Sequence, residues 1–242
     1  MKNIFALLLT FISFTLTAQN FMVPGDTTLE TKWMKNESYQ MKWYVLNGGQ
    51  THEVARINSR IMVGKSQLSI ITSVDVNNAK TTWIDSTITK LPSFLPIRHY
   101  SDNLERTVRL KFGTSVTGTY LDKLKKLKIT INDAAAPGKY FDSNFYPYLI
   151  RLLPLKDGYT QNIATYDYSV AKSGPIMAQI KEVKSGTYES KQGLRTVWIV
   201  TSLETIKGQV SQVDYFIDKA DRRIWKQEIF DGVQHTLIER VE

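Results

Sequence analysis

Residues 39–49 read YQMKWYVLNGG, and this stretch points to the class of fold. Over residues 39–45 every second side chain is apolar, and a period of two is typical of a strand with one buried face. The NGG sequence at 47–49 supplies a turn that tolerates positive φ, and another strand-like run covers 54–63. The stretch therefore predicts an antiparallel β-hairpin.

Similar patterns recur along the rest of the chain. We expect further strands at residues 67–76, 81–88, 107–112, 116–121, 127–131, 162–168, 176–183, 196–203, 213–217, 224–230 and 236–241. This gives roughly twelve to fourteen strands, too many for a flat sheet to stay uncurled. The predicted fold is mainly β, a single, highly curved antiparallel sheet.

One segment departs from the strand pattern. Its apolar residues at helical spacing are Phe145, Tyr148, Leu149 and Leu152. Asn144 can cap the helix, Pro147 fits its first turn, and Pro154 ends it. We expect one short helix over residues 144–153, packed on the concave face of the sheet through Phe145, Leu149 and Leu152.

The start of the chain resembles a secretory signal peptide. Lys2 precedes an apolar run over residues 4–16, and Ala18 is a small residue suited to cleavage. We expect export, cleavage after about Ala18, and a single β domain over 19–242 with possible halves at 19–136 and 137–242. No later segment has the length of a transmembrane helix.

Composition narrows the classes of function. The chain has no cysteine, so its stability has to come from a packed core rather than from disulfides. A formal net charge of +8 favours anionic partners, which outside the cytoplasm means lipid headgroups or acidic glycans before nucleic acid. We expect no nucleic-acid partner.

Catalytic motifs are incomplete. Residues 64–66 (GKS) lack the earlier glycine of a phosphate-binding loop, and His52-Glu53 lacks the second histidine of a zinc-protease helix. The three histidines are isolated in sequence, so we place them at the surface or on edge strands. Asp85 could pair with a second carboxylate, as glycosidases require, but a sequence cannot show that pairing. We expect no catalytic residues, metal or cofactor.

Two sets of residues are candidates for binding. Aromatic and apolar residues that could line a pocket for a lipophilic ligand, or simply fill the core, are Trp43, Trp83, Tyr148, Leu149 and Leu152. Basic residues that could contact an anionic surface, or protect an edge strand from aggregation, are Lys123, Lys125, Lys126 and Lys128.

Three stretches resemble a known family. They are residues 145–158 (FYPYLIRLLPLKDG), 213–227 (VDYFIDKADRRIWKQ) and 83–87 (WIDST), and they are similar to segments of the periplasmic domain of unknown function 3108 family. The resemblance implies an exported β protein with a fold similar to the open half-barrels of the lipoprotein carriers LolA and LolB. No catalytic residues come with the family.

These observations together predict a protein of the periplasm that is not an enzyme. The leading hypothesis is a binding or carrier module for a lipid or another apolar small molecule. The alternatives are a structural or assembly partner protein at the cell envelope, which would bind an envelope protein, and a periplasmic hydrolase.

Overall fold

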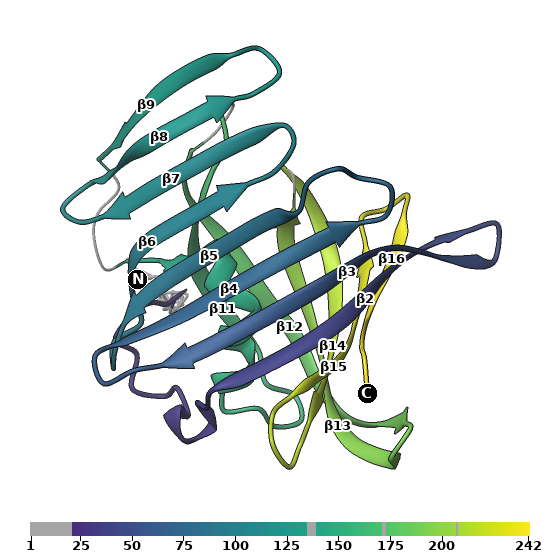
Figure 1. The fold of residues 1–242 in the computed structure, drawn as a ribbon. Helices are drawn as coiled ribbons and strands as arrows, with labels where there is room; N and C mark the ends of the chain where they lie inside the picture. The colour runs from purple at the N-terminus through teal and green to yellow at the C-terminus, as the bar shows by residue number, and fades with distance from the viewer. Residues whose placement is uncertain (1–20, 135–138, 171–172, 207) are drawn as a thin grey trace, which may run out of the picture.

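The computed structural model describes residues 21–134, 139–170, 173–206 and 208–242 (Figure 1). The predicted signal peptide lies outside the described residues. The described strands form one sheet of 16 strands. Their bounds are β1 Phe21–Met22, β2 Glu37–Asn47, β3 Gln50–Val63, β4 Gln67–Val76, β5 Trp83–Lys90, β6 Leu95–Asp102, β7 Arg106–Phe112, β8 Val116–Asp122, β9 Leu127–Asp133, β10 Phe141–Asp142, β11 Gln161–Tyr168, β12 Ser173–Ser190, β13 Gly193–Ile206, β14 Gln209–Asp218, β15 Ile224–Phe230 and β16 His235–Arg240.

The order of strands joins the two halves of the chain. It runs β1-β11-β12-β13-β14-β15-β16-β2-β3-β4-β5-β6-β7-β8-β9, with β10 beside β11. Pairing is antiparallel except where β1 and β10 meet β11. The halves meet where β16 pairs with β2, with Ile238 opposite Trp43, and also where the short strand β1 pairs with β11. Since β1 and β9 lie at opposite ends of the order, the sheet is not closed into a barrel.

The predicted β class is confirmed, and most strands lie where alternation places them. The bounds of β4 and β15 match the predicted ranges, whereas β12 and β13 extend well beyond theirs. The strand β6 was not predicted. Its second residue is Pro96, which disfavours a strand, and its apolar residues do not alternate with a clean period of two. The sequence therefore does not indicate a strand at these residues.

The helical segment is less regular than predicted. It consists of a 3₁₀ turn η2 (Ser143–Phe145), the four-residue helix α1 (Tyr146–Leu149) and a second 3₁₀ turn η3 (Ile150–Leu152). Another 3₁₀ turn, η1, covers Thr31–Trp33. The predicted cap at Asn144 is wrong, because Asp142 caps the segment by accepting a hydrogen bond from the Asn144 backbone N–H. Pro147 lies in the first turn of α1, as predicted.

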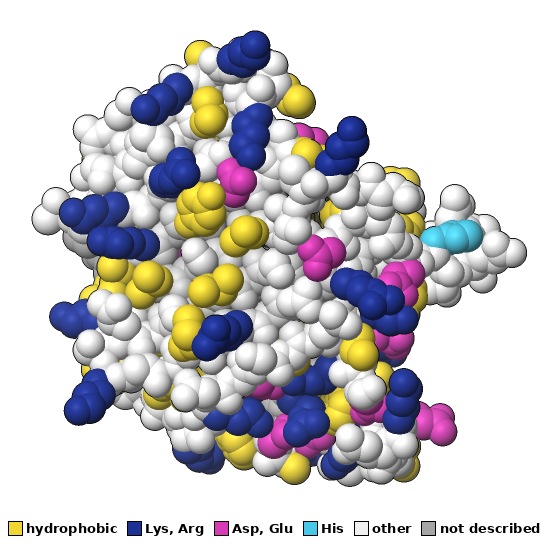
Figure 2. All heavy atoms as spheres, in the orientation of Figure 1, with side chains coloured by type: hydrophobic (Ala, Val, Ile, Leu, Met, Phe, Trp, Pro, Cys, Tyr) yellow, Lys and Arg dark blue, Asp and Glu magenta, His cyan; other side chains and the backbone are white. Residues whose placement is uncertain are grey.

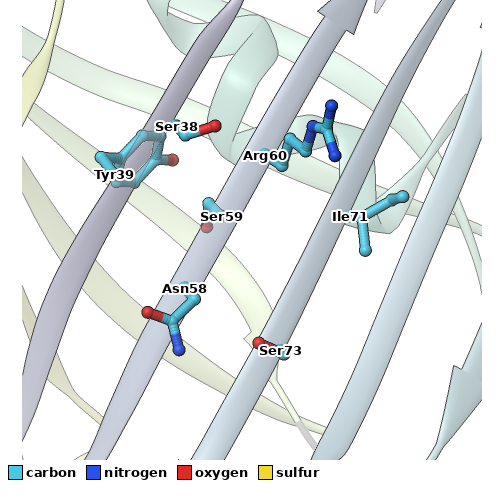
Figure 3. A pocket seen from close by; sticks show the side chains of 7 residues that line it. All are labelled: Ser38, Tyr39, Asn58, Ser59, Arg60, Ile71 and Ser73. Atoms are coloured by element: carbon cyan, nitrogen blue, oxygen red, sulfur yellow. The ribbon is translucent and has the colours of Figure 1, made fainter.

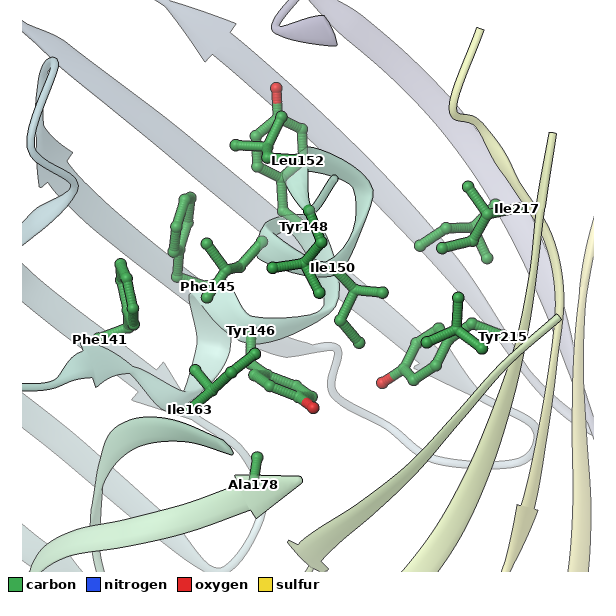
Figure 4. Close-up of a cluster of buried hydrophobic side chains, with 14 of the residues drawn as sticks. Phe141, Phe145, Tyr146, Tyr148, Ile150, Leu152, Ile163, Ala178, Tyr215 and Ile217 are labelled. Carbon is green, nitrogen blue, oxygen red and sulfur yellow. The ribbon is translucent and has the colours of Figure 1, made fainter. Parts of the chain in front are cut away.

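The segment fills the space between the two halves of the sheet (Figures 1 and 4). Phe145, Leu149 and Leu152 are fully buried, which confirms their predicted orientation into the core. They belong to one apolar cluster with Ile61 of β3 and Ile217 of β14. Burying each such side chain contributes about 1.5 to 3 kcal/mol, so this segment is a main source of stability.

A buried ion-pair network fixes the end of the segment. Arg151 is 1% exposed. Its guanidinium donates from Nη2 to Glu37 Oε2 of β2 at 2.8 Å and from Nε to the Arg222 carbonyl at 2.6 Å. Arg240 of β16 donates to the other Glu37 oxygen at 2.6 Å. Burial raises the pKa of Glu37, but the two arginines lower it more, so the carboxylate stays charged. Removing one member of a buried charge pair typically costs about 3 to 5 kcal/mol.

A second interior carboxyl has no cationic partner in the described structure. Glu204 of β13 accepts hydrogen bonds from Ser202 at 2.5 Å and from the Tyr215 hydroxyl at 2.8 Å. Burial raises its pKa to about 7, although these two hydrogen bonds act in the opposite direction. The folded protein therefore retains the Glu204 proton over a pH range in which the unfolded chain releases it.

We predict that Leu149→Asp destabilises the protein by more than about 4 kcal/mol or prevents folding, because it places a carboxylate inside the core. The measurement is urea unfolding followed by tryptophan fluorescence. Leu194→Asp is the matched control, since Leu194 is 72% exposed, and it should unfold like the wild type. Equal midpoints for the wild type and Leu149→Asp would show that the segment contributes little to the core.

A second prediction concerns pH. The folded-state pKa of Glu204 lies above the ordinary value of 4.5. The contribution of Glu204 to the free energy of unfolding therefore declines as pH rises from about 4.5 to 7, by up to about 1.4 kcal/mol per pKa unit. Glu204→Gln should remove this part of the pH dependence and be more stable than the wild type at pH 8. Glu182→Gln, at an exposed position of β12, should leave the profile unchanged. Parallel profiles of the wild type and Glu204→Gln would refute the prediction.

Candidate functional site

An apolar cavity of about 250 Å³ lies where β5 ends, β6 begins and β7 ends. Its lining residues are Lys90, Leu95, Pro96, Ile97, Phe112, Gly113 and Tyr140. Pro96 has no backbone N–H, and the pairing of β5 with β6 shifts register between Ile88 and Thr89, so the sheet is irregular at this corner. This irregularity leaves room beside the core.

Aromatic rings form one wall of the cavity. The ring centroids of Phe112 and Tyr140 lie 6.3 Å apart, and Tyr140 in turn lies 5.1 Å from Tyr166 of β11. These rings belong to a second apolar cluster, which includes Val108, Leu110 and Ile131. The wall is therefore held by packing between β7 and the second half of the chain.

Lys90 supplies the single charge among the lining residues of this cavity. It is exposed, and the described residues provide no ion-pair partner for it. Apolar walls with one cation match the chemistry of an apolar molecule that carries an anionic group. We call this the Lys90 cavity.

A buried polar cluster lies at the start of the helical segment. Asp142 accepts hydrogen bonds from the Thr87 hydroxyl at 2.5 Å and from the Asn144 backbone N–H at 3.2 Å, and its Oδ1 lies 2.9 Å from His99 Nδ1. The Asp142 side chain is 1% exposed and that of His99 is 10% exposed. Asp142 thus connects β5 and β6 to the beginning of η2.

The prediction of a surface or edge-strand position for His99 is wrong, since β6 lies between β5 and β7 in the sheet. Its ring is buried because β6 places it on the interior face, opposite Thr87 in the ladder. Burial lowers the pKa of His99, but the nearby carboxylates of Asp142, Asp85 and Asp167 raise it more, so the net shift is upward. His52 and His235 are exposed, as predicted.

Asp85 lies in the same region, opposite Ser101 in the β5–β6 ladder. Burial raises its pKa, and the neighbouring Ser101 hydroxyl, His99, Arg106 and Asn144 offset part of this increase. A polar pocket of about 200 Å³ adjoins it, lined by Ile70, Thr72, Asp85, Ser86, Thr87, Ser143, Asn144 and Pro147. Asp85 lines this pocket, whereas His99 is not among its lining residues, so the Asp85 carboxyl is the group with a shifted pKa that a small polar molecule would meet there.

A third depression, of about 450 Å³, runs across β2, β3 and β4 (Figure 3). Its lining residues are Ser38, Tyr39, Asn58, Ser59, Arg60, Ile71 and Ser73. None of these lining residues is a histidine or carries a carboxylate, so the depression offers no general acid–base pair. We assign no function to it.

The residues predicted to bind a lipophilic ligand divide into two groups. Trp43, Tyr148, Leu149 and Leu152 meet in the apolar cluster around the helical segment. Trp83 is not among them and lies at the start of β5, opposite Val74. None of the five lines the cavities described above. Their role in binding stays a prediction.

The four predicted lysines lie together at the β8–β9 hairpin. Lys123 donates to the Asn103 carbonyl at 2.6 Å and pairs with Asp102 at 3.0 Å, and Lys125 lies 4.0 Å from Asp122. Lys126 and Lys128 are exposed. Contact of these lysines with an anionic surface stays a prediction at this point.

Sequence reasoning did not find the Lys90 cavity. A lone lysine after a predicted strand does not indicate a binding site, and Tyr140 reaches the cavity from a different part of the chain.

Within the described ranges no group of histidine and acidic side chains is arranged to hold a metal ion. None of the helices described here is long and apolar enough to cross a membrane.

Comparison with protein families gives one match. The family described as "Protein of unknown function (DUF3108)" matches residues 38–238, which cover the sheet from β2 to β16. No curated protein and no solved structure matches the chain. Because the match spans most of the sequence and both halves of the sheet, the chain belongs to the DUF3108 family.

Proposed function

We propose that this protein is a non-catalytic binding or carrier module for a lipophilic ligand, exported to the periplasm. The Lys90 cavity is the observation that supports it, since its walls are apolar and its one charged lining residue is a lysine. The resemblance to the DUF3108 family implies a fold similar to the half-barrel carriers LolA and LolB, and these carriers offer a parallel for such a role.

The cavity favours a small or partly inserted ligand. A volume of about 250 Å³ lies near the lower limit of typical small-molecule sites, so a short alkyl chain fits better than a whole lipid. Each buried methylene contributes about 0.8 kcal/mol, and an anionic group near the Lys90 ammonium adds a favourable charge interaction. The ligand class is therefore an alkyl chain with an acidic group.

We predict that the protein binds decanoate more tightly than decanol, as measured by isothermal titration calorimetry. Lys90→Met should weaken decanoate binding roughly fivefold or more and leave decanol binding nearly unchanged, because it removes the cation alone. Lys65→Met, at an exposed lysine outside the cavity, is the matched control and should bind like the wild type.

A second variant reduces the volume of the cavity. A Cβ at Gly113 would meet no atom closer than 3.8 Å, so this lining residue accepts a larger side chain. Gly113→Leu should weaken the binding of both decanoate and decanol. Absence of decanoate binding to the wild type, or unchanged binding in both variants, would contradict the proposal.

A second candidate function is hydrolysis, which the grouping of Asp85, His99 and Asp142 beside a polar pocket favours. In that role His99, oriented by Asp142, would activate a water molecule. A panel of p-nitrophenyl esters and glycosides should then be turned over by the wild type and at least about 100-fold more slowly by His99→Gln. No turnover, or equal rates, would exclude this use of the cluster.

A further inference from the structure

Two neighbouring turns expose leucines at one corner of the sheet. Leu104, in the turn between β6 and β7, is 54% exposed, while Leu124 and Leu127 of the β8–β9 hairpin are 74% and 50% exposed. Large apolar side chains are costly to leave in water when they cluster, and such patches commonly mark interaction sites. We call Leu104, Leu124 and Leu127 with the lysines around them the double-turn surface.

Hydrogen bonds hold the two turns side by side. The Lys123 backbone N–H donates to the Glu105 carbonyl at 2.8 Å, and the Lys123 ammonium donates to the Asn103 carbonyl at 2.6 Å. Because Lys123 precedes Leu124 directly and Asn103 precedes Leu104, these bonds bring the two leucines to the same corner. The leucines therefore belong to one surface.

In each turn, a side chain at the start of the turn accepts hydrogen bonds from the backbone and stiffens it. Asn103 Oδ1 accepts from the backbone N–H groups of Glu105 and Arg106, both at 2.9 Å. Asp122 Oδ1 accepts from those of Leu124 at 3.0 Å and Lys125 at 2.8 Å. Such caps fix the turns and keep the leucines directed outward.

The charge around the leucines is mainly basic. The basic residues are Arg106, Lys123, Lys125, Lys126 and Lys128, and the acidic ones are Asp102, Glu105 and Asp122. Asp102 and Asp122 are paired with Lys123 and Lys125. Lys126 and Lys128 form no ion pair with the described residues. Figure 2 shows basic and hydrophobic side chains interspersed over the part of the molecule that contains β7–β9.

Other hairpin tips lack this combination. Leu194, the second residue of β13, is 72% exposed and is the one large apolar side chain exposed at the β12–β13 turn in the described structure. At the β15–β16 turn two apolar side chains are exposed, Phe230 at 50% and Val233 at 94%. The Val233 turn also contains Asp231 in place of lysines. The double-turn surface is therefore distinguished by three leucines and unpaired lysines in one place.

We propose that the double-turn surface docks on an anionic lipid bilayer. The leucines enter the boundary between headgroups and acyl chains, and Lys126 and Lys128 contact the phosphates. Exposed apolar turns with lysines beside them suit insertion into a negatively charged bilayer surface, since apolar area and charge attraction add in interfacial binding. This inference goes beyond the proposed ligand binding and does not rest on it.

The test is cosedimentation of the full chain with vesicles, either of phosphatidylcholine alone or mixed with phosphatidylglycerol. The wild type should partition on the order of tenfold more strongly to the mixed vesicles, and added salt should reduce this preference. The triple variant Leu104→Ser, Leu124→Ser, Leu127→Ser should bind mixed vesicles on the order of tenfold less. The double variant Lys126→Gln, Lys128→Gln should lose most of the preference for anionic lipid.

Leu194→Ser is the matched control, because it removes a leucine of similar exposure from another tip, and it should bind like the wild type. All variants should unfold at the same urea concentration as the wild type, and the triple variant should bind decanoate like the wild type if the Lys90 cavity is a ligand site. No binding of the wild type to mixed vesicles would overturn the proposal. Unchanged binding of the triple variant, or an equal loss of binding in Leu194→Ser, would also overturn the proposal. In each of these cases a protein partner would account better for the exposed leucines.

Discussion

The pairing of Arg151 with Glu37 is the constraint on which the arrangement of the interior depends. Both groups are buried, and a buried guanidinium without a carboxylate would be strongly destabilising. Glu37 opens β2, Arg240 closes β16, and these two strands join the halves of the sheet. Because Arg151 also donates to the Arg222 carbonyl beside β15, the end of the helical segment is fixed at the junction of the halves.

The other end of the segment is held by Asp142. Its carboxylate bonds Thr87 of β5 and the first turn of the segment, and it contacts His99 of β6. Between these two polar attachments, Phe145 and Leu149 fill the space between the halves. The interior is consequently packed with the protein's own side chains, and the Lys90 cavity remains at the corner where Pro96 interrupts the ladder. Ligand binding there does not require displacement of the helical segment.

The sequence predicts those features that depend on local pattern. Runs of β-branched and apolar residues between turn signals predicted the bounds of β4 and β15, and helical spacing with Pro147 identified the buried segment. The strand β6 was missed because Pro96 and an irregular pattern obscure it, and with it the burial of His99. The Asp142 bonds join residues 55 and 43 positions apart, so no local pattern reveals them. The lysines of the β8–β9 hairpin were recognised, but their proximity to Leu104 depends on the β6–β7 turn, which only the fold brings near.

Native mass spectrometry of the protein, purified without detergent, tests most directly whether the Lys90 cavity is a ligand site. We expect a mass excess that disappears on denaturation, and Gly113→Leu should reduce the occupied fraction while Lys65→Met leaves it unchanged. The released mass would identify the ligand, which we expect to combine an alkyl chain with an acidic group. A bare mass of the wild type both before and after denaturation would contradict this role.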